Sequence, residues 1–111
     1  MVKDTGFVDG SENVFADIGV RDPEESRLRA DLARQIVRLI RKRGLRQTDV
    51  AEILGVDQAK VSKLVRGRIS GFTSDRLLRF LKALGCRVRI EVREPRSMRR
   101  RVRGKVEVVA V

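Results

Sequence analysis

The chain has 111 residues, with 26 Lys and Arg, 15 Asp and Glu, no His, one Cys and a net charge of +11. This length allows one small domain with tails. One cysteine excludes an intrachain disulfide, and the lack of histidine argues against a zinc site, so we expect neither metal nor cofactor. No run is apolar enough for a membrane span or a signal peptide, so we expect a cytoplasmic protein.

The charge is unevenly distributed. Residues 1–26 hold two basic and seven acidic side chains, a net of −5, which leaves +16 for residues 27–111. A basic body of this kind favours a polyanion, and nucleic acid is the first candidate. A membrane surface would require a basic amphipathic helix with large apolar residues, which the sequence lacks.

Residues 1–21 have two interpretations. Their scattered Gly and Asp residues are typical of a flexible acidic leader. Alternatively, Val14, Phe15 and Ile18 share one helical face and predict a partner-binding segment.

A long helix is predicted to begin at Asp22-Pro23-Glu24-Glu25, where Asp22 can cap and Pro23 suits the first helical position. An apolar stripe follows, formed by Leu28, Leu32, Ile36, Leu39 and Ile40. The helix should end at Lys42-Arg43 before Gly44, about 30 Å from its start.

The run 47–66 predicts two short helices joined by a tight turn. Val50 and Leu54 lie four residues apart in the first helix, and Gly55 permits the sharp turn after it. Asp57 can cap the second helix, Gln58–Arg66, whose inward face is Val61, Leu64 and Val65. This arrangement is that of a helix-turn-helix, in which the second helix enters the DNA major groove.

After the loop 67–71, Thr73 or Ser74 should open a further helix that ends at Leu84. Residues 87–93 then alternate between charged and apolar, which predicts a β-strand with Val88, Ile90 and Val92 on one face. A lone strand needs a partner. The partner is either the run 105–111, in a hairpin across the Arg-rich loop 94–104, or the same strand of a second subunit, which we favour for a dimer.

The predicted fold is therefore mainly α: a repressor-like helix-turn-helix domain of four to five helices with a C-terminal β-strand or hairpin that dimerises. The predicted divisions are the acidic leader at 1–21, the DNA-binding domain at 22–85, and the strand or hairpin with its Arg-rich loop at 86–111.

The residues Gln47, Ala51, Gly55-Val56, Gln58, Val61-Ser62 and Leu64 resemble the phage-repressor-like (XRE) helix-turn-helix family. Together with the run 13–19, Arg43-Gly44-Leu45 and Phe80-Leu81, they resemble its HigA-like type II antitoxin branch over about residues 11–93. The resemblance implies a dimer that represses its own operon and neutralises a RelE/HigB-like mRNA endonuclease toxin. A stand-alone XRE regulator without a toxin partner is the alternative.

One position departs from the family. Arg46 stands where the family usually has Thr or Ser as the cap of the first motif helix, and its guanidinium is instead available for a phosphate.

The candidate DNA-binding residues lie on and around the second motif helix. Candidates for contacts with bases are Gln58, Ala59, Ser62, Lys63 and Arg66. Candidates for contacts with phosphates are Gln47, Lys60 and Arg68, of which Gln47 matches a family position with that role.

We do not expect an enzyme, because His and Tyr are absent and no paired carboxylates sit at useful helical spacing in a predicted pocket. Cys86, at the predicted helix–strand junction, is better explained as a small buried residue. The aromatic platforms typical of RNA-binding domains are also missing, with Phe72 and Phe80 assigned to the core.

Overall fold

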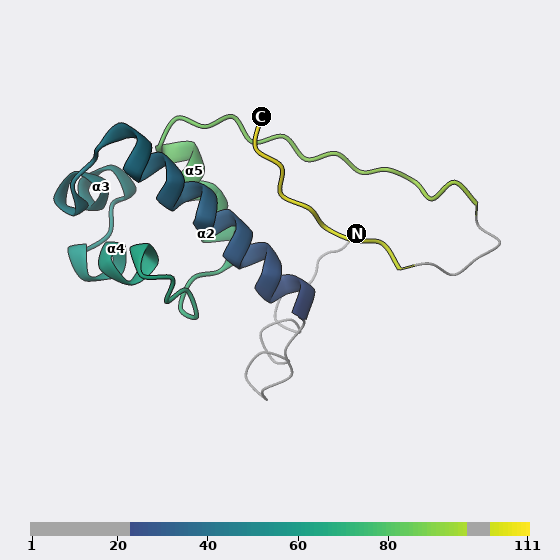
Figure 1. The fold of residues 1–111 in the computed structure, drawn as a ribbon, viewed down its shortest axis with the longest axis horizontal. Helices are drawn as coiled ribbons and strands as arrows, with labels where there is room; N and C mark the ends of the chain where they lie inside the picture. Colours follow the sequence, from purple (N-terminus) through teal and green to yellow (C-terminus); the bar gives the residue numbers. More distant parts are fainter. Residues whose placement is uncertain (1–22, 98–102) are drawn as a thin grey trace.

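The computed structural model describes residues 23–97 and 103–111. The described part contains four helices: α2 (Pro23–Arg43), α3 (Gln47–Leu54), α4 (Gln58–Val65) and α5 (Ser74–Ala83). α2 runs the length of the helical body, and α3 and α4 gather near its C-terminal half (Figure 1). The prediction of a mainly α fold is confirmed. The proposed cap Asp22 and the segment 1–21 lie outside the described residues.

α2 has the predicted bounds, and its ends explain why. Pro23 occupies the first position, where the missing N–H costs nothing, and acidic Glu24 and Glu25 lie at the positive end of the helix dipole. Three basic residues occupy the last turn, at the negative end. Gly44 then adopts a φ of 64°, and the next residue, Leu45, donates its N–H to the carbonyl of Ile40 at 3.0 Å. This left-handed turn ends the helix.

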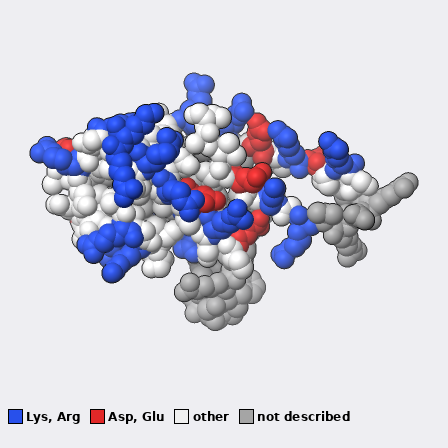
Figure 2. Space-filling model, viewed as in Figure 1, with Lys and Arg blue, Asp and Glu red and all other residues white. Residues whose placement is uncertain are grey.

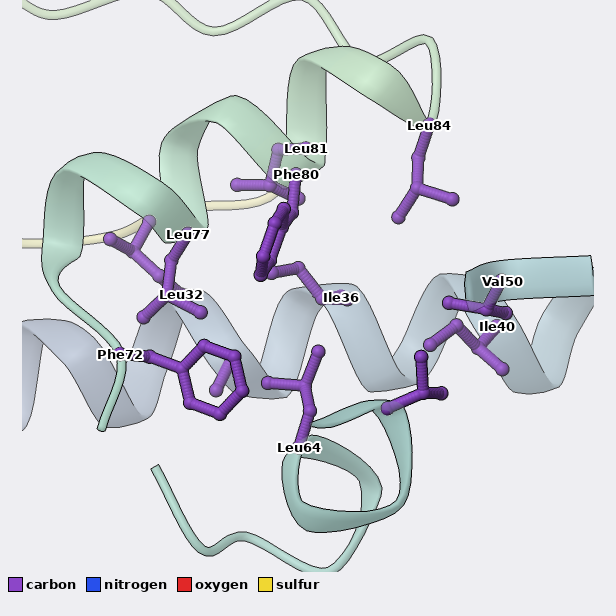
Figure 3. Close-up of a cluster of buried hydrophobic side chains, with 12 residues drawn as sticks. Leu32, Ile36, Ile40, Val50, Leu64, Phe72, Leu77, Phe80, Leu81 and Leu84 are labelled. Carbon is purple, nitrogen blue, oxygen red and sulfur yellow. The ribbon is translucent and has the colours of Figure 1, made fainter. Parts of the chain in front are cut away.

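A single hydrophobic core joins the four helices (Figure 3). Its members come from all of them and from the loop before α5: Leu32, Ala33, Ile36, Ile40, Val50, Val61, Leu64, Phe72, Leu77, Phe80, Leu81 and Leu84. The rings of Phe72 and Phe80 meet edge to face with centroids 6.0 Å apart. The apolar faces predicted for α2 and α4 therefore converge on one cluster with the buried residues of α5.

Two arginines of α2 connect this helix to the two ends of α5. Arg29 donates to the carbonyl of Phe72 at 3.3 Å, just before α5 begins, and Arg43 donates to the carbonyl of Leu84 at 2.6 Å, just after α5 ends. The two helices therefore run in the same direction. The predicted opening of α5 is also found, because the hydroxyl of Thr73 accepts the N–H of Arg76 at 3.1 Å.

The predicted β-strand or hairpin is not found in the part of the chain that the structure describes. Residues 87–93 and 105–111 are drawn out beside the helices without forming a β-ladder (Figure 1). The C-terminal run instead contacts the start of α2, where the N–H of Val106 donates to Glu24 Oε2 at 3.0 Å. Residues 87–93 alternate between charged and apolar in the sequence, but alternation alone supplies no hydrogen-bonding partner.

Two further findings concern the last residue of α4 and whether a described helix could span a membrane. α4 ends at Val65, and Arg66 serves as its C-cap rather than its last helical residue. α2 is 21 residues long, but its charged side chains are too many for a bilayer, and no other described helix could span one either.

Candidate nucleic-acid interface

The turn between α3 and α4 is fixed by two residues. Gly55 adopts a φ of 69°, a conformation that costs other residues free energy, and the N–H of Val56 bonds to the carbonyl of Ala51 at 3.1 Å. Asp57 then caps α4, because its carboxylate accepts the N–H of Lys60 at 2.9 Å. The direction in which α4 leaves the turn is therefore set by the backbone and by one carboxylate.

α4 divides sharply into a buried face and an outer face. Val61 and Leu64 are 0% and 1% exposed and anchor the helix in the core. Outside this buried face lie the predicted site residues Gln58, Ala59, Lys60, Ser62 and Lys63 of the helix and its C-cap Arg66, with Lys60 and Ser62 half-buried and the others exposed. The structure therefore brings these six predicted residues together on one outer surface, which we call the α4 surface.

A basic hollow adjoins the α4 surface. It has a volume of about 240 Å³, and its lining residues are Lys60, Lys63, Arg68, Ser70, Gly71 and Phe72. Three of these six residues are cationic and none is acidic. The hollow therefore has the size and charge to receive an anionic oxygen group.

The loop after α4 creates this hollow by turning back. Gly67 adopts a φ of 81°, its N–H bonds to the carbonyl of Leu64, and the N–H of Arg68 bonds to that of Lys63 at 2.9 Å. Arg68 is thereby brought beside the end of the helix. Sequence reasoning named Arg68 but missed Ser70 and Gly71, because no local pattern indicates that the loop folds over α4.

Two of the predicted base-contacting residues are joined. Arg66 donates from its guanidinium to the hydroxyl oxygen of Ser62 at 2.7 Å, one helical turn away. Since a guanidinium has five N–H donors, this bond orients Arg66 and leaves donors for a ligand.

The N-terminus of α3 differs from the prediction. Gln47 is the half-buried first residue of α3, as expected. Arg46 provides no side-chain acceptor, and two of the five N–H donors of its guanidinium bond to Asp49 at 3.1 Å and 3.3 Å. The same hydrogen bonds lower the pKa of the Asp49 carboxyl and raise the pKa of Arg46. The Arg46 side chain is therefore oriented by an ion pair with Asp49 that the sequence did not indicate, and its contact with a phosphate stays a prediction.

The remaining predicted residues lie away from the α4 surface. Val88, Ile90 and Val92 are 39%, 74% and 89% exposed in the extended run after α5. The segment containing Val14, Phe15 and Ile18 lies outside the described residues. Within the described ranges, no three His, Cys, Asp or Glu side chains come together as metal ligands do.

The electrostatic character of the molecule agrees with its composition. Lys and Arg side chains outnumber carboxylates on the face seen in Figure 2, which has α2 in front. Within the loop–helix–loop from Asp57 to Gly71, four basic residues accompany a single acidic one. That one carboxylate, Asp57, is used to cap α4. The α4 surface is therefore cationic with no competing free carboxylate of its own.

A capped α4, anchored inward and presented outward after a glycine turn from α3, defines a helix-turn-helix protein. The sequence profile of a family described as "Helix-turn-helix domain" matches residues 14–93. A solved structure named as an XRE family transcriptional regulator is 34% identical, with a TM-score of 0.74, and the match covers 82% of this chain and all of that chain. The chain belongs to the XRE family of helix-turn-helix proteins. Comparison with curated proteins gives no match.

Proposed function

We propose that this protein is a sequence-specific DNA-binding transcriptional repressor that acts as a homodimer, and not an enzyme. The observation that carries the proposal is the division of α4. Its core side is fixed by Val61 and Leu64, while the predicted base-contacting side chains face solvent together. The name of the similar XRE protein, a transcriptional regulator, supports the same function.

Reading of bases is assigned to the outer residues of α4 in the major groove. The side-chain amide of Gln58 can bond adenine through two hydrogen bonds, and the ammonium of Lys63 can donate to guanine. The methyl group of Ala59 suits a thymine methyl. All three residues are exposed, and none needs to leave the core to reach a base.

Phosphate binding is assigned to the two edges of this surface. On one side, Lys60 and Arg68 line the basic hollow. The other side is assigned to Gln47, because it is the first residue of α3, where the helix dipole favours an anion. Contacts at both edges would fix the register of α4 between the two DNA strands.

Dimerisation is assigned to the run 87–93. Helix-turn-helix dimers bind two half-sites about one turn of DNA apart, so a two-fold interface doubles the number of bases read. The exposed Val88, Ile90 and Val92 support this assignment, because they offer an apolar surface outside the helical core.

Footprinting of the DNA upstream of the protein's own coding sequence tests the function. We expect two protected half-sites with centres about 10 base pairs apart. The protection should survive excess unrelated DNA, whereas binding through charge alone would be competed away. If the protein protects no particular sequence and unrelated DNA competes fully for binding, the proposal is wrong.

A second function, as the antitoxin of a type II pair, is favoured by the charge division. Residues 1–26 carry a net of −5 against +16 in the rest of the chain. An acidic segment outside a basic DNA-binding body is suited to a basic protein partner, such as a RelE/HigB-like mRNA endonuclease. The family match begins at residue 14 and so includes Val14, Phe15 and Ile18.

Deletion of residues 1–21 separates the antitoxin from a stand-alone repressor. If a small toxin-like reading frame adjoins the coding sequence, its product should be neutralised by the full chain and not by the truncated chain. Operator affinity should remain nearly the same. Neutralisation that survives the deletion would contradict the role of Val14, Phe15 and Ile18, and absence of any such reading frame favours the stand-alone repressor.

A further inference from the structure

The run 87–93 has the side-chain pattern of a β-strand even though no described residue pairs with it. Glu91 accepts hydrogen bonds from Arg89 at 2.8 Å and from Arg93 at 3.3 Å. These three residues therefore lie on one side of the run, as residues two apart do in a strand. Val88, Ile90 and Val92 lie on the other side, and the last two are 74% and 89% exposed. The run is thus an extended segment with the charged and apolar faces of a strand.

The C-terminal run is engaged elsewhere. The N–H of Val106 bonds to Glu24 of α2, and Val108 is half-buried against the core of the helical body. These contacts hold the run 105–111 at the start of α2. With 105–111 engaged, no other extended run among the described residues is left for 87–93, and the same run of a second copy fits the proposed dimer, on which this inference rests.

We infer that two copies pair these runs antiparallel about a two-fold axis through Ile90, so that Ile90 lies opposite the partner's Ile90. Residues equally far from Ile90 on its two sides then face each other. Val88 lies opposite the partner's Val92, and Arg89 lies opposite the partner's Glu91. Each apolar side chain of the run meets an apolar one, and two pairs of opposite charge form across the strands.

Other registers match the sequence less well. A slip that pairs odd-numbered with even-numbered residues places apolar side chains opposite charged ones. A two-fold axis through Val92 places Ile90 opposite the partner's Glu94. An axis through Glu91 places that carboxylate opposite its own copy and Arg89 opposite the partner's Arg93. Direct opposition of like charges destabilises a strand pair.

The strongest competitor is an axis through Arg89. In that register Val88 faces the partner's Ile90, but Arg89 faces its own copy at the centre of the ribbon. The next apolar pair would use Cys86, which is tied to the helical body because its N–H bonds to the carbonyl of Leu81 at 2.9 Å. The Ile90 register avoids both problems. Its like-charge pairs, Arg87 with the partner's Arg93 and the symmetric pair, lie at the two ends of the ribbon, where Glu91 already forms an ion pair with Arg93.

Disulfide trapping in the full-length protein tests the register. The native cysteine is first removed as Cys86→Ser, and one new cysteine is introduced at a time. Opposed residues of an antiparallel pair have Cα atoms about 4.5–5.5 Å apart, within disulfide range. Ile90→Cys should therefore form a covalent dimer on mild oxidation. Val88→Cys or Val92→Cys alone should not, whereas a mixture of the two proteins should form a mixed dimer.

Three outcomes would overturn the inference, each in a different way. Self-crosslinking of Arg89→Cys without that of Ile90→Cys would place the axis at Arg89. No crosslink at any position, in a protein that sediments as a dimer, would place the interface elsewhere and leave the dimeric repressor standing. A chain that sediments as a monomer with intact operator binding would remove the proposed dimer itself.

Exchange of the charges at Arg89 and Glu91 tests the register independently and needs no oxidation. Glu91→Arg converts both cross-strand pairs to like charges and should weaken dimerisation about tenfold. The double variant Arg89→Glu with Glu91→Arg restores two opposite-charge pairs in this register and should regain wild-type dimerisation. Failure of the double variant to recover would contradict the assignment. Both positions are exposed, so neither change disturbs the core.

Discussion

Asp49 compensates for the missing side-chain cap at Arg46. Its carboxylate accepts the backbone N–H of Arg46 at 3.2 Å and two guanidinium bonds at 3.1 Å and 3.3 Å. Half of a capping box is thus retained, with the acceptor on the third residue of α3 and not on the cap residue. An arginine is tolerated here because Asp49 bonds to both its backbone and its side chain.

This ion pair predicts a pH-dependent contribution to stability. The hydrogen bond from the Arg46 side chain lowers the pKa of Asp49 in the folded state. A lowered pKa stabilises the folded state above the unfolded pKa, and the stabilisation is lost as the pH falls below about 4. Asp49→Asn should therefore lower the melting temperature near neutral pH and differ little from wild type in acid. Thermal denaturation followed by circular dichroism over this range measures the difference.

Glu52→Gln is the matched control. Glu52 lies on the same helix, and its exposed carboxylate accepts no hydrogen bond from the described residues. A gap between wild type and Asp49→Asn that stays constant from neutral pH into acid would show that the ionised carboxylate is not what stabilises α3.

The N-cap of α4 predicts a loss of stability when its carboxylate is removed. Asp57→Ala leaves the N–H of Lys60 without its acceptor and should cost about 1 kcal/mol. In a domain of this size the melting temperature should fall by about 4–8 °C. Asp57→Ser retains an acceptor and should recover most of the loss. If the serine variant is as unstable as the alanine variant, the cap is not the cause.

The buried face of α4 predicts a larger effect. Leu64 is 1% exposed in the core, so Leu64→Ala should cost about 2–5 kcal/mol through lost burial and a cavity. Ile53, on α3, is 43% exposed, and Ile53→Ala should cost less than about 1 kcal/mol. Urea denaturation gives both free energies of unfolding. Similar losses for the two variants would show that α4 is not anchored through Leu64.

The helices could be predicted from the sequence because their signals are local. The bounds of α2 and α3, the caps Asp57 and Thr73, and the turn at Gly55 each follow from residues a few positions apart. The outer face of α4 follows from the position of its buried valine and leucine. This is why the sequence could place the candidate residues of α4 outside its buried face, while their contacts with DNA stay a prediction.

The features that could not be predicted depend on contacts between distant residues. The bonds from Arg29 and Arg43 to the ends of α5 join residues 43 and 41 positions apart. The hollow beside α4 depends on how the loop 67–71 turns back, which no periodicity describes. The strand was predicted from alternation alone, but pairing depends on a partner outside its own sequence.

The basic hollow predicts how salt affects operator binding. If Arg68 binds one phosphate, Arg68→Ala should reduce the slope of log affinity against log salt concentration by about 0.9. Arg27→Ala removes the same charge from an exposed position on α2, outside the hollow, and should change the slope less. Equal changes for the two variants would mean that only the overall charge of the protein matters, and not the hollow. Filter binding at several salt concentrations supplies the slopes.

Lys63 and Gln47 should differ in how their loss affects specificity. Lys63 is exposed on the outer face of α4, so Lys63→Ala should cost about 1–3 kcal/mol on the operator and much less on a site with the contacted base changed. Gln47 lies at the N-terminus of α3, and Gln47→Ala should weaken binding by a similar factor on both sites, because phosphates carry no sequence information. Affinities of both variants for operators with single base changes separate the roles. Equal, sequence-independent losses would contradict base reading by Lys63, and a loss for Gln47→Ala confined to one base pair would contradict its phosphate role.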